Sequence, residues 1–264
     1  MQLLLRAFLA IYLAHLLAEF VLQPHRLIEQ KRRGNPAAYL LHGIIHYLSA
    51  VFIMGFVVPG SLLSLRTQFV LAALTLVHLL IDFSRTRLAR THMQFAGSWA
   101  YASDQLLHTL TVILAAWLLS PAVPLSALGP SLQNFRAIPN RFLAVPVIYV
   151  GVTFGGGYLI RFLVRSLAAS VDSSLEGTTS EQLQNAGLYI GWLERFMVIT
   201  ALLLQSPATV GMILTAKSIA RYPELKSQRF AEYYLIGTLL SISMALLGGA
   251  FLAKLIFGQV HVPG

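Results

Sequence analysis

The sequence predicts an all-α protein, a polytopic transmembrane helical bundle with about seven or eight membrane segments. Of its 264 residues, 56% are hydrophobic and only 11% are charged, whereas soluble domains carry about 25% charged residues. The mean hydropathy is +0.70. Apolar runs close to the roughly 20 residues that a membrane-spanning helix requires recur along the whole chain. These observations exclude a soluble globular domain.

Seven apolar runs lie at about 3–22, 38–58, 67–84, 100–119, 142–164, 187–205 and 231–257. An eighth, at 207–220, is short and follows Ser206-Pro207, where proline interrupts a helix. We expect it to form a short or re-entrant segment. The first run lacks an obvious cleavage site of small residues, so we expect it to remain as a helix. The predicted parts are a four-helix half at 1–120, a proline-rich non-cytoplasmic connection at 121–141 and a helical half at 142–264.

The distribution of positive charge predicts the orientation. The net charge is +9, but the basic residues lie between apolar runs, so we expect a lipid bilayer and no nucleic acid as the partner. By the positive-inside rule the three basic segments are cytoplasmic, and both termini then lie outside the cytoplasm. The basic residues concerned are Arg26, Lys31, Arg32 and Arg33, then Arg85, Arg87 and Arg90, then Lys217, Arg221, Lys226 and Arg229.

Each of the first four runs contains two His, Asp or Glu residues four positions apart. Residues at this spacing share a helix face, as the two metal ligands of the H-E-x-x-H motif do. The eight His and ten acidic residues of the chain would produce about one such pair by chance. The predicted orientation puts all four pairs at one depth, near the cytoplasmic boundary. We therefore predict one cluster of eight side chains: His15, Glu19, His42, His46, His78, Asp82, Asp104 and His108.

This cluster predicts a metal site. Buried carboxylates are costly without positive partners, and we expect few cations at that depth, so one or two divalent ions would supply the charge. The chain has no cysteine, which leaves imidazole and oxygen ligands; these favour zinc, with manganese or iron as alternatives. The alternative is that the pairs are interhelical hydrogen bonds that lock the bundle.

The motifs HLLAEFVLQ at 15–23, LHGIIH at 41–46, HLLID at 78–82 and DQLLH at 104–108 resemble an uncharacterised family of bacterial membrane proteins, a domain of unknown function. The resemblance extends over nearly the whole chain, with GLYIGWLER at 187–195, AKSIARYPELK at 216–226 and EYYLIGT at 232–238. Many relatives have Asp where this chain has Glu19. The resemblance implies the bacterial inner membrane. The recurrent H-x-x-x-D pattern is also similar to that of membrane-bound metal-dependent hydrolases.

Three functions are compatible with these features. The first is a metal-dependent hydrolase acting on an anionic lipid or a phosphorylated small molecule at the cytoplasmic leaflet, with Arg85 and Arg87, together with Lys31 to Arg33, holding the anion. Those arginines are equally typical of plain topology markers. The second is a divalent transition-metal transporter, and the third a structural or regulatory membrane component. The sequence has no G-x-S-x-G motif and no cysteine, so it indicates neither a serine nor a thiol nucleophile.

The back half has a polar set of its own: Glu194, Arg195, Lys217, Glu224, Lys226 and Glu232. Glu194 and Arg195 lie inside an apolar run, where an unpaired charge is costly. We expect Glu194 or Arg195 to form an ion pair with Lys217 or Glu232. A structural role is favoured over catalysis, and a transporter would use Lys217, Glu194 and Glu232 for gating or proton coupling.

Overall fold

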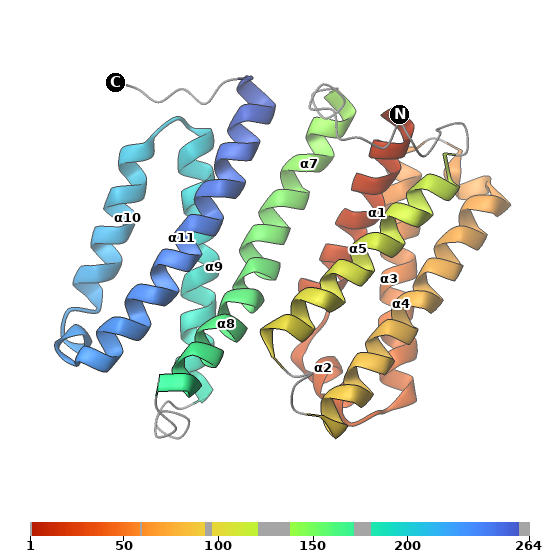
Figure 1. Cartoon of the computed structure of the whole chain (residues 1–264). Coiled ribbons are helices and arrows are strands. Elements are labelled where there is room, and N and C mark those ends of the chain that lie inside the picture. Colours follow the sequence, from red (N-terminus) through yellow and green to blue (C-terminus); the bar gives the residue numbers. More distant parts are fainter. Residues whose placement is uncertain (1, 59, 93–96, 121–137, 172–180, 259–264) are drawn as a thin grey trace. The chain divides into compact units, whose positions relative to one another are not determined.

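A computed structural model of the chain describes the backbone of residues 2–58, 60–92, 97–120, 138–171 and 181–258. Secondary structure in these ranges is entirely helical, which confirms the all-α prediction. The helices form two compact units, Met1–Val150 and Gly151–Gly264, and Figure 1 shows the helices of each.

Unit 1 is built around its first helix. α1 (Gln2–Phe20) packs against α3 (Pro36–Val57), α5 (Ser98–Leu118) and α7 (Ile138–Val150), while α4 (Leu65–Thr91) packs against α3 and α5. Alanines recur along the buried side of α1, at Ala7, Ala10, Ala14 and Ala18. Small residues let helix backbones approach closely in a membrane bundle, so α1 occupies the centre of the unit.

Short, capped connections make neighbouring helices of unit 1 antiparallel. α3 begins at Pro36, and the Asn35 side chain accepts a hydrogen bond of 3.0 Å from the backbone N–H of Ala37. Before α4, the 3-10 turn η1 (Ser61–Leu63) reverses the chain, and Ser64 caps the helix by accepting from the backbone N–H of Thr67. α1 and α4 therefore end, and α3 and α5 begin, at the same end of the bundle (Figure 1).

This end also carries α2 (His25–Arg32), and we call it the α2 end. Most of the basic residues of the first two basic segments lie in helices, α2 and α4. α2 buries Leu27 and Lys31, which share a face because they are four residues apart. Arg85, Arg87 and Arg90 lie in the last turns of α4, whose 27 residues span about 40 Å, more than the roughly 30 Å of a bilayer core. The helix is long enough to carry these arginines beyond the apolar layer.

The surface of unit 1 exposes large apolar side chains, while its interior buries the polar histidine side chains. Phe52, Phe56 and Phe69 are 75%, 86% and 75% exposed, whereas His42 and His78 are 0% and 3% exposed. Soluble proteins show the opposite pattern. Among the residues that the structure describes, five helical stretches are long and apolar enough to cross a membrane: Gln2–Phe20, Pro36–Val57, Leu65–Thr91, Asn140–Val164 and Phe230–Phe257. The total of seven or eight segments stays a prediction.

Unit 2 consists of η4 (Gly151–Gly155, a π-helical turn), α8 (Gly156–Val171), α9 (Glu181–Leu203), α10 (Pro207–Ala220), η6 (Glu224–Lys226) and α11 (Gln228–Phe257). α11 packs against α8 and α9. The chain turns at Gln205, which has a φ of 55°, and α10 runs antiparallel to α9 (Figure 1). α10 has 14 residues, about 21 Å, which fits the short segment expected at 207–220.

The boundary between the units lies later than the division expected from the sequence. α7 was assigned to the back half, but it packs against α1 and so belongs to unit 1. Most of the proline-rich connection, residues 121–137, lies outside the described residues. Proximity to α1, which the local sequence does not reveal, determines where α7 belongs.

Candidate metal centre

Four helices of unit 1 each contribute one of the predicted pairs. The pairs lie near the C-terminal end of α1, at and just beyond the middle of α4, and in the N-terminal halves of α3 and α5. Because these helices alternate in direction, all four pairs reach the same level near the α2 end. Ring contacts and polar contacts join the eight side chains into one cluster, which we call the histidine cluster: His15, Glu19, His42, His46, His78, Asp82, Asp104 and His108.

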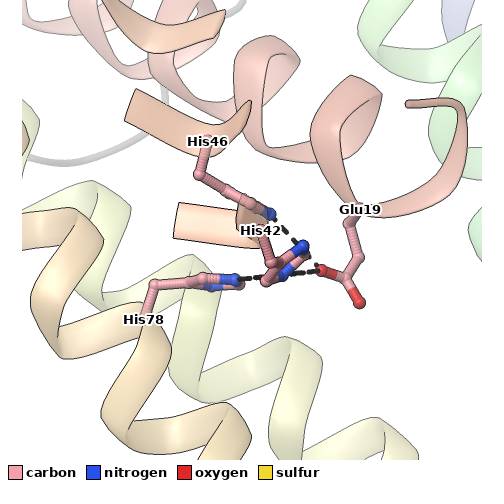
Figure 2. A group of neighbouring side chains, drawn as sticks. All are labelled: Glu19, His42, His46 and His78. Carbon is pink, nitrogen blue, oxygen red and sulfur yellow. Dashed lines mark hydrogen bonds and ion pairs between the residues drawn. The ribbon is translucent and has the colours of Figure 1, made fainter. Parts of the chain in front are cut away.

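Within the cluster, one carboxylate faces three imidazoles. Oε2 of Glu19 lies 3.4 Å from Nε2 of His42, 3.5 Å from Nε2 of His46 and 3.9 Å from Nε2 of His78. Nε2 of His42 lies 3.0 Å from Nε2 of His78. Figure 2 shows these four side chains pointing toward one another from α1, α3 and α4.

These separations are those expected of ligands on one metal ion. Zinc–nitrogen bonds of about 2.0–2.1 Å in a tetrahedron place neighbouring ligand atoms about 3.3–3.4 Å apart. Four of the six separations among these atoms, 3.0, 3.4, 3.5 and 3.9 Å, lie around that value, and all the ligand atoms lie within 4.8 Å of one another. Glu19, His42, His46 and His78 could therefore hold a metal ion.

A second group shares one histidine with the first. His78, Asp82 and His108 also present ligand atoms close enough together to hold an ion. Nδ1 of His78 lies 3.0 Å from Nδ1 of His108, and Nε2 of His108 lies 3.4 Å from Oδ1 of Asp82. Because His78 has one nitrogen toward each group, it is the central residue of the cluster.

Several polar atoms of the cluster lack hydrogen bonds. Within the described part of the chain, six buried atoms of the cluster neither donate nor accept a hydrogen bond: Nε2 of His15, Nε2 of His46, Oε2 of Glu19, Nδ1 of His42, Nε2 of His108 and Oδ1 of Asp104. An unsatisfied buried polar group costs about 1–3 kcal/mol. A bound cation would satisfy the imidazole and carboxylate lone pairs, so the donor set fits a metal.

Sequence reasoning missed a cation in the cluster. Nζ of Lys31 lies 2.5 Å from Oδ2 of Asp82, and both side chains are buried. The side-chain N–H of Gln23 donates to the backbone oxygen of Glu19, and the side-chain oxygen of Gln23 accepts from Nζ of Lys31; both distances are 3.0 Å. The expectation that this depth holds few cations is wrong for Asp82. The sequence feature that could have revealed a buried Lys31 is its position four residues after Leu27, which places both residues on one face of a short helix.

A second cation reaches Asp104. Nη1 of Arg85 lies 3.4 Å from Oδ2 of Asp104, whose Oδ1 lies 3.5 Å from Nε2 of His108. Asp104 belongs to neither group of ligand atoms and instead contacts the His108 ring. Arg85 is one-third exposed, and Arg87 is exposed. The structure thus separates the two arginines, because only Arg85 touches the cluster.

A cavity of about 20 Å³ adjoins the cluster on the side away from the α2 end. It is lined by four of the histidines and, one helical turn farther, by Ile11, Ala50, Leu74 and Val112. The hydroxyl-bearing residues Thr75 and Thr111 also line it. A volume of this size holds about one water molecule.

The polar residues of the back half form a separate set in unit 2. Nζ of Lys217 lies 2.7 Å from Oε2 of Glu194, as expected. Arg195 is buried and donates to the backbone oxygen of Thr153 in η4 and to Ser241. Glu232 is exposed and accepts from Gln228 within its own helix, so it is not the partner of Glu194 or Arg195.

Comparison with known proteins matches residues 7–129 to a family described as a protein of unknown function (DUF3307). The matched range contains the entire histidine cluster with Lys31 and the arginines of α4, while the back-half motifs lie outside it. No curated protein and no solved structure matches the chain. Residues 7–129 of the chain are therefore similar to this uncharacterised family.

Proposed function

We propose that the protein is an integral membrane hydrolase that uses a divalent metal ion to cleave an anionic lipid or a phosphoester at the cytoplasmic leaflet of the bacterial inner membrane. The observation that carries the proposal is the convergence of three imidazoles and one carboxylate at metal-ligand separations, inside helices that are long and apolar enough to span a bilayer. Zinc suits this donor set best, and manganese or iron are alternatives.

The balance of charge favours a single ion. The cluster holds three carboxylates, and Lys31 and Arg85 each lie against one of them. Glu19 alone lacks such a cation among the described residues. One divalent ion beside Glu19 leaves the cluster with a small positive charge, whereas two ions would leave an excess that a low-dielectric interior disfavours.

Catalytic zinc sites keep three protein ligands and one open position. We assign His42, His46 and His78 to the ion, since all three are buried, and Glu19 to proton transfer, since its side chain is the most exposed of the four at 14%. An ion held there would polarise a phosphoryl or carbonyl oxygen and acidify a water molecule.

The proposed residues account for each part of the reaction. Glu19 takes a proton from water as the water oxygen bonds to phosphorus, or to the carbonyl carbon of an ester. The ester bond to the leaving alcohol then breaks, and the proton passes from Glu19 to the alcohol oxygen. Arg85, which is partly exposed, holds the anionic oxygens. Asp104 orients His108 and Arg85 beside the reacting group.

The test separates metal binding from turnover. Purified wild-type protein should contain close to one equivalent of a transition metal and should hydrolyse a phosphoester or lipid ester. His42→Ala should lose the metal and the activity together. Glu19→Gln should retain the metal but lose activity by about 10²-fold or more, which is the typical contribution of a general base. His25→Ala is the matched control, because His25 is exposed outside the cluster.

Two outcomes would replace the proposal. If proteoliposomes move a divalent ion down its gradient while no ester is consumed, the protein is a transporter. The apolar lining of the cavity beyond the histidines, at Ile11, Ala50, Leu74 and Val112, is unlike a path for ions to the opposite face. If the wild-type protein binds no metal and His42→Ala only lowers its stability, the cluster locks the bundle.

A further inference from the structure

A second hollow lies at the α2 end of unit 1, outside the histidine cluster. It has a volume of about 220 Å³ and is formed where the connection between α2 and α3 meets the last turns of α4. Three arginines and two aromatic residues line it, together with a glycine: Arg33, Arg87, Arg90, Tyr39, Phe83 and Gly34. We call it the arginine pocket. None of these residues belongs to either group of metal-ligand atoms.

The arginine pocket has an excess of positive charge. Arg33 pairs with Glu29 at 2.5 Å, and both are exposed. In the ranges that the structure describes, no carboxylate lies within ion-pairing distance of Arg87 or Arg90. These two residues are three apart on α4, so they share a face and repel each other. An anion bound between them would relieve that repulsion.

The backbone of the α2–α3 connection approaches the Arg90 guanidinium closely. Gly34 has a φ of +79°, which favours glycine, and a Cβ at this position would lie 3.1 Å from Nη1 of Arg90. Any other residue would therefore strain the turn and push the guanidinium away. On the other side, the Tyr39 and Phe83 rings pack edge to face with centroids 5.7 Å apart. The pocket thus has one charged side and one aromatic side.

We propose that the arginine pocket binds a phosphate group. The planar guanidinium matches phosphate oxygens in a bidentate manner, and several arginines suit a doubly charged anion better than a single carboxylate. The volume is below the about 300–1,000 Å³ of pockets for drug-sized ligands, so it fits a headgroup-sized anion. The aromatic side accommodates the carbon atoms of a phosphate ester. Assignment of this phosphate to the substrate rests on the proposed function, whereas phosphate binding itself does not.

Titration calorimetry of the full-length protein in neutral detergent tests the proposal. The probes are inorganic phosphate and a short-chain phosphatidic acid. We expect saturable binding that Arg87→Ala/Arg90→Ala weakens about tenfold or more, because a hydrogen bond to a charged group is worth that factor. Arg26→Ala/Arg32→Ala removes the same charge from exposed positions outside the pocket and should change the affinity less than twofold.

The two probes identify the source of the phosphate. Tighter binding of phosphatidic acid than of inorganic phosphate assigns a lipid headgroup, and equal binding assigns a soluble phosphate. The proposal is overturned if neither probe binds saturably, or if both double variants weaken binding equally. The double variant Arg87→Gln/Arg90→Gln removes the two charges but keeps polar side chains. If it unfolds at the wild-type temperature and still binds phosphate weakly, the loss of affinity comes from lost contacts and not from misfolding.

Different experimental results would contradict phosphate binding in the arginine pocket and the proposed hydrolase function. Protein stripped of metal by a chelator should still bind phosphate, since the pocket shares no residue with the ligand groups. A protein that binds phosphate but hydrolyses nothing contradicts the hydrolase proposal alone. A protein that hydrolyses a phosphoester but binds neither probe in the arginine pocket contradicts this inference alone.

Discussion

Replacing Lys31 by methionine removes the cation next to Asp82 and should make metal binding tighter. The two charged groups are 2.5 Å apart, and their side chains are 9% and 5% exposed. Methionine retains much of the length and apolar character of the lysine stem. The variant therefore deletes the charge of Lys31 while disturbing little of its packing.

The expected size of the effect follows from burial. Removing one partner of a buried ion pair costs about 3–5 kcal/mol, because the other charge is left uncompensated. Oδ2 of Asp82 lies 3.3 Å from Nε2 of His42, so an ion on His42 would return positive charge to its vicinity. If the ion recovers about 3 kcal/mol, its affinity rises by about 10²-fold.

The assay combines thermal unfolding with zinc titration against a competing chelator. Without metal, Lys31→Met should unfold at a lower temperature than wild type, and zinc should raise its unfolding temperature by a larger increment. Lys31→Arg keeps the charge and should behave like wild type. Arg26→Met is the matched control, since it removes an equal charge from an exposed site on the same helix. Equal zinc affinity in wild type and Lys31→Met would refute the reasoning.

Three further predictions concern the cluster and its support. His78→Ala should abolish metal binding, because His78 belongs to both ligand groups; elemental analysis beside exposed His25→Ala checks this, and retained metal would contradict it. Asp104→Asn should leave the stoichiometry unchanged and lower metal affinity less than about tenfold, because Asp104 contacts His108, which contacts the ligand His78 and not the ion, whereas loss of a direct partner of a ligand costs about 10–100-fold; loss of stoichiometric binding would instead make Asp104 a ligand. Gly43→Ala places a Cβ 2.8 Å from Cδ1 of Leu79, the end of a side chain that can shift, and raises helix propensity by about 1 kcal/mol; thermal unfolding should therefore change by less than about 1 kcal/mol, and a larger loss would show that Leu79 cannot move.

The histidine cluster was predictable because its signal is local. Four pairs at helical spacing, each within one apolar run, define a face on each helix without any knowledge of the neighbours. Alternation of helix direction then brings pairs near the ends of odd-numbered spans to the level of pairs near the starts of even-numbered spans. The separations of 3.4 and 3.5 Å from Glu19 to His42 and His46 depend on how α1 and α3 pack, and no spacing along the chain contains them.

The roles of the basic residues were not predictable in the same way. Lys31 and Arg85 have the same sequence signature as any positive residue at the end of a membrane span. Lys31 lies against Asp82 because α2 folds back over the end of the bundle and buries the face that carries Leu27 and Lys31. Arg87 is two positions beyond Arg85, which turns it to another side of α4 and into the arginine pocket.

Composition and periodicity within one helix are enough to predict that the chain is helical and apolar, and that each of its first four helices presents a pair of His, Asp or Glu residues. The packing of the helices sets which of these side chains meet at ligand distance, which carboxylates have a cation beside them, and that α7 packs with α1. Contacts between residues far apart in the chain depend on how whole helices pack, and the sequence of a single segment does not specify that packing.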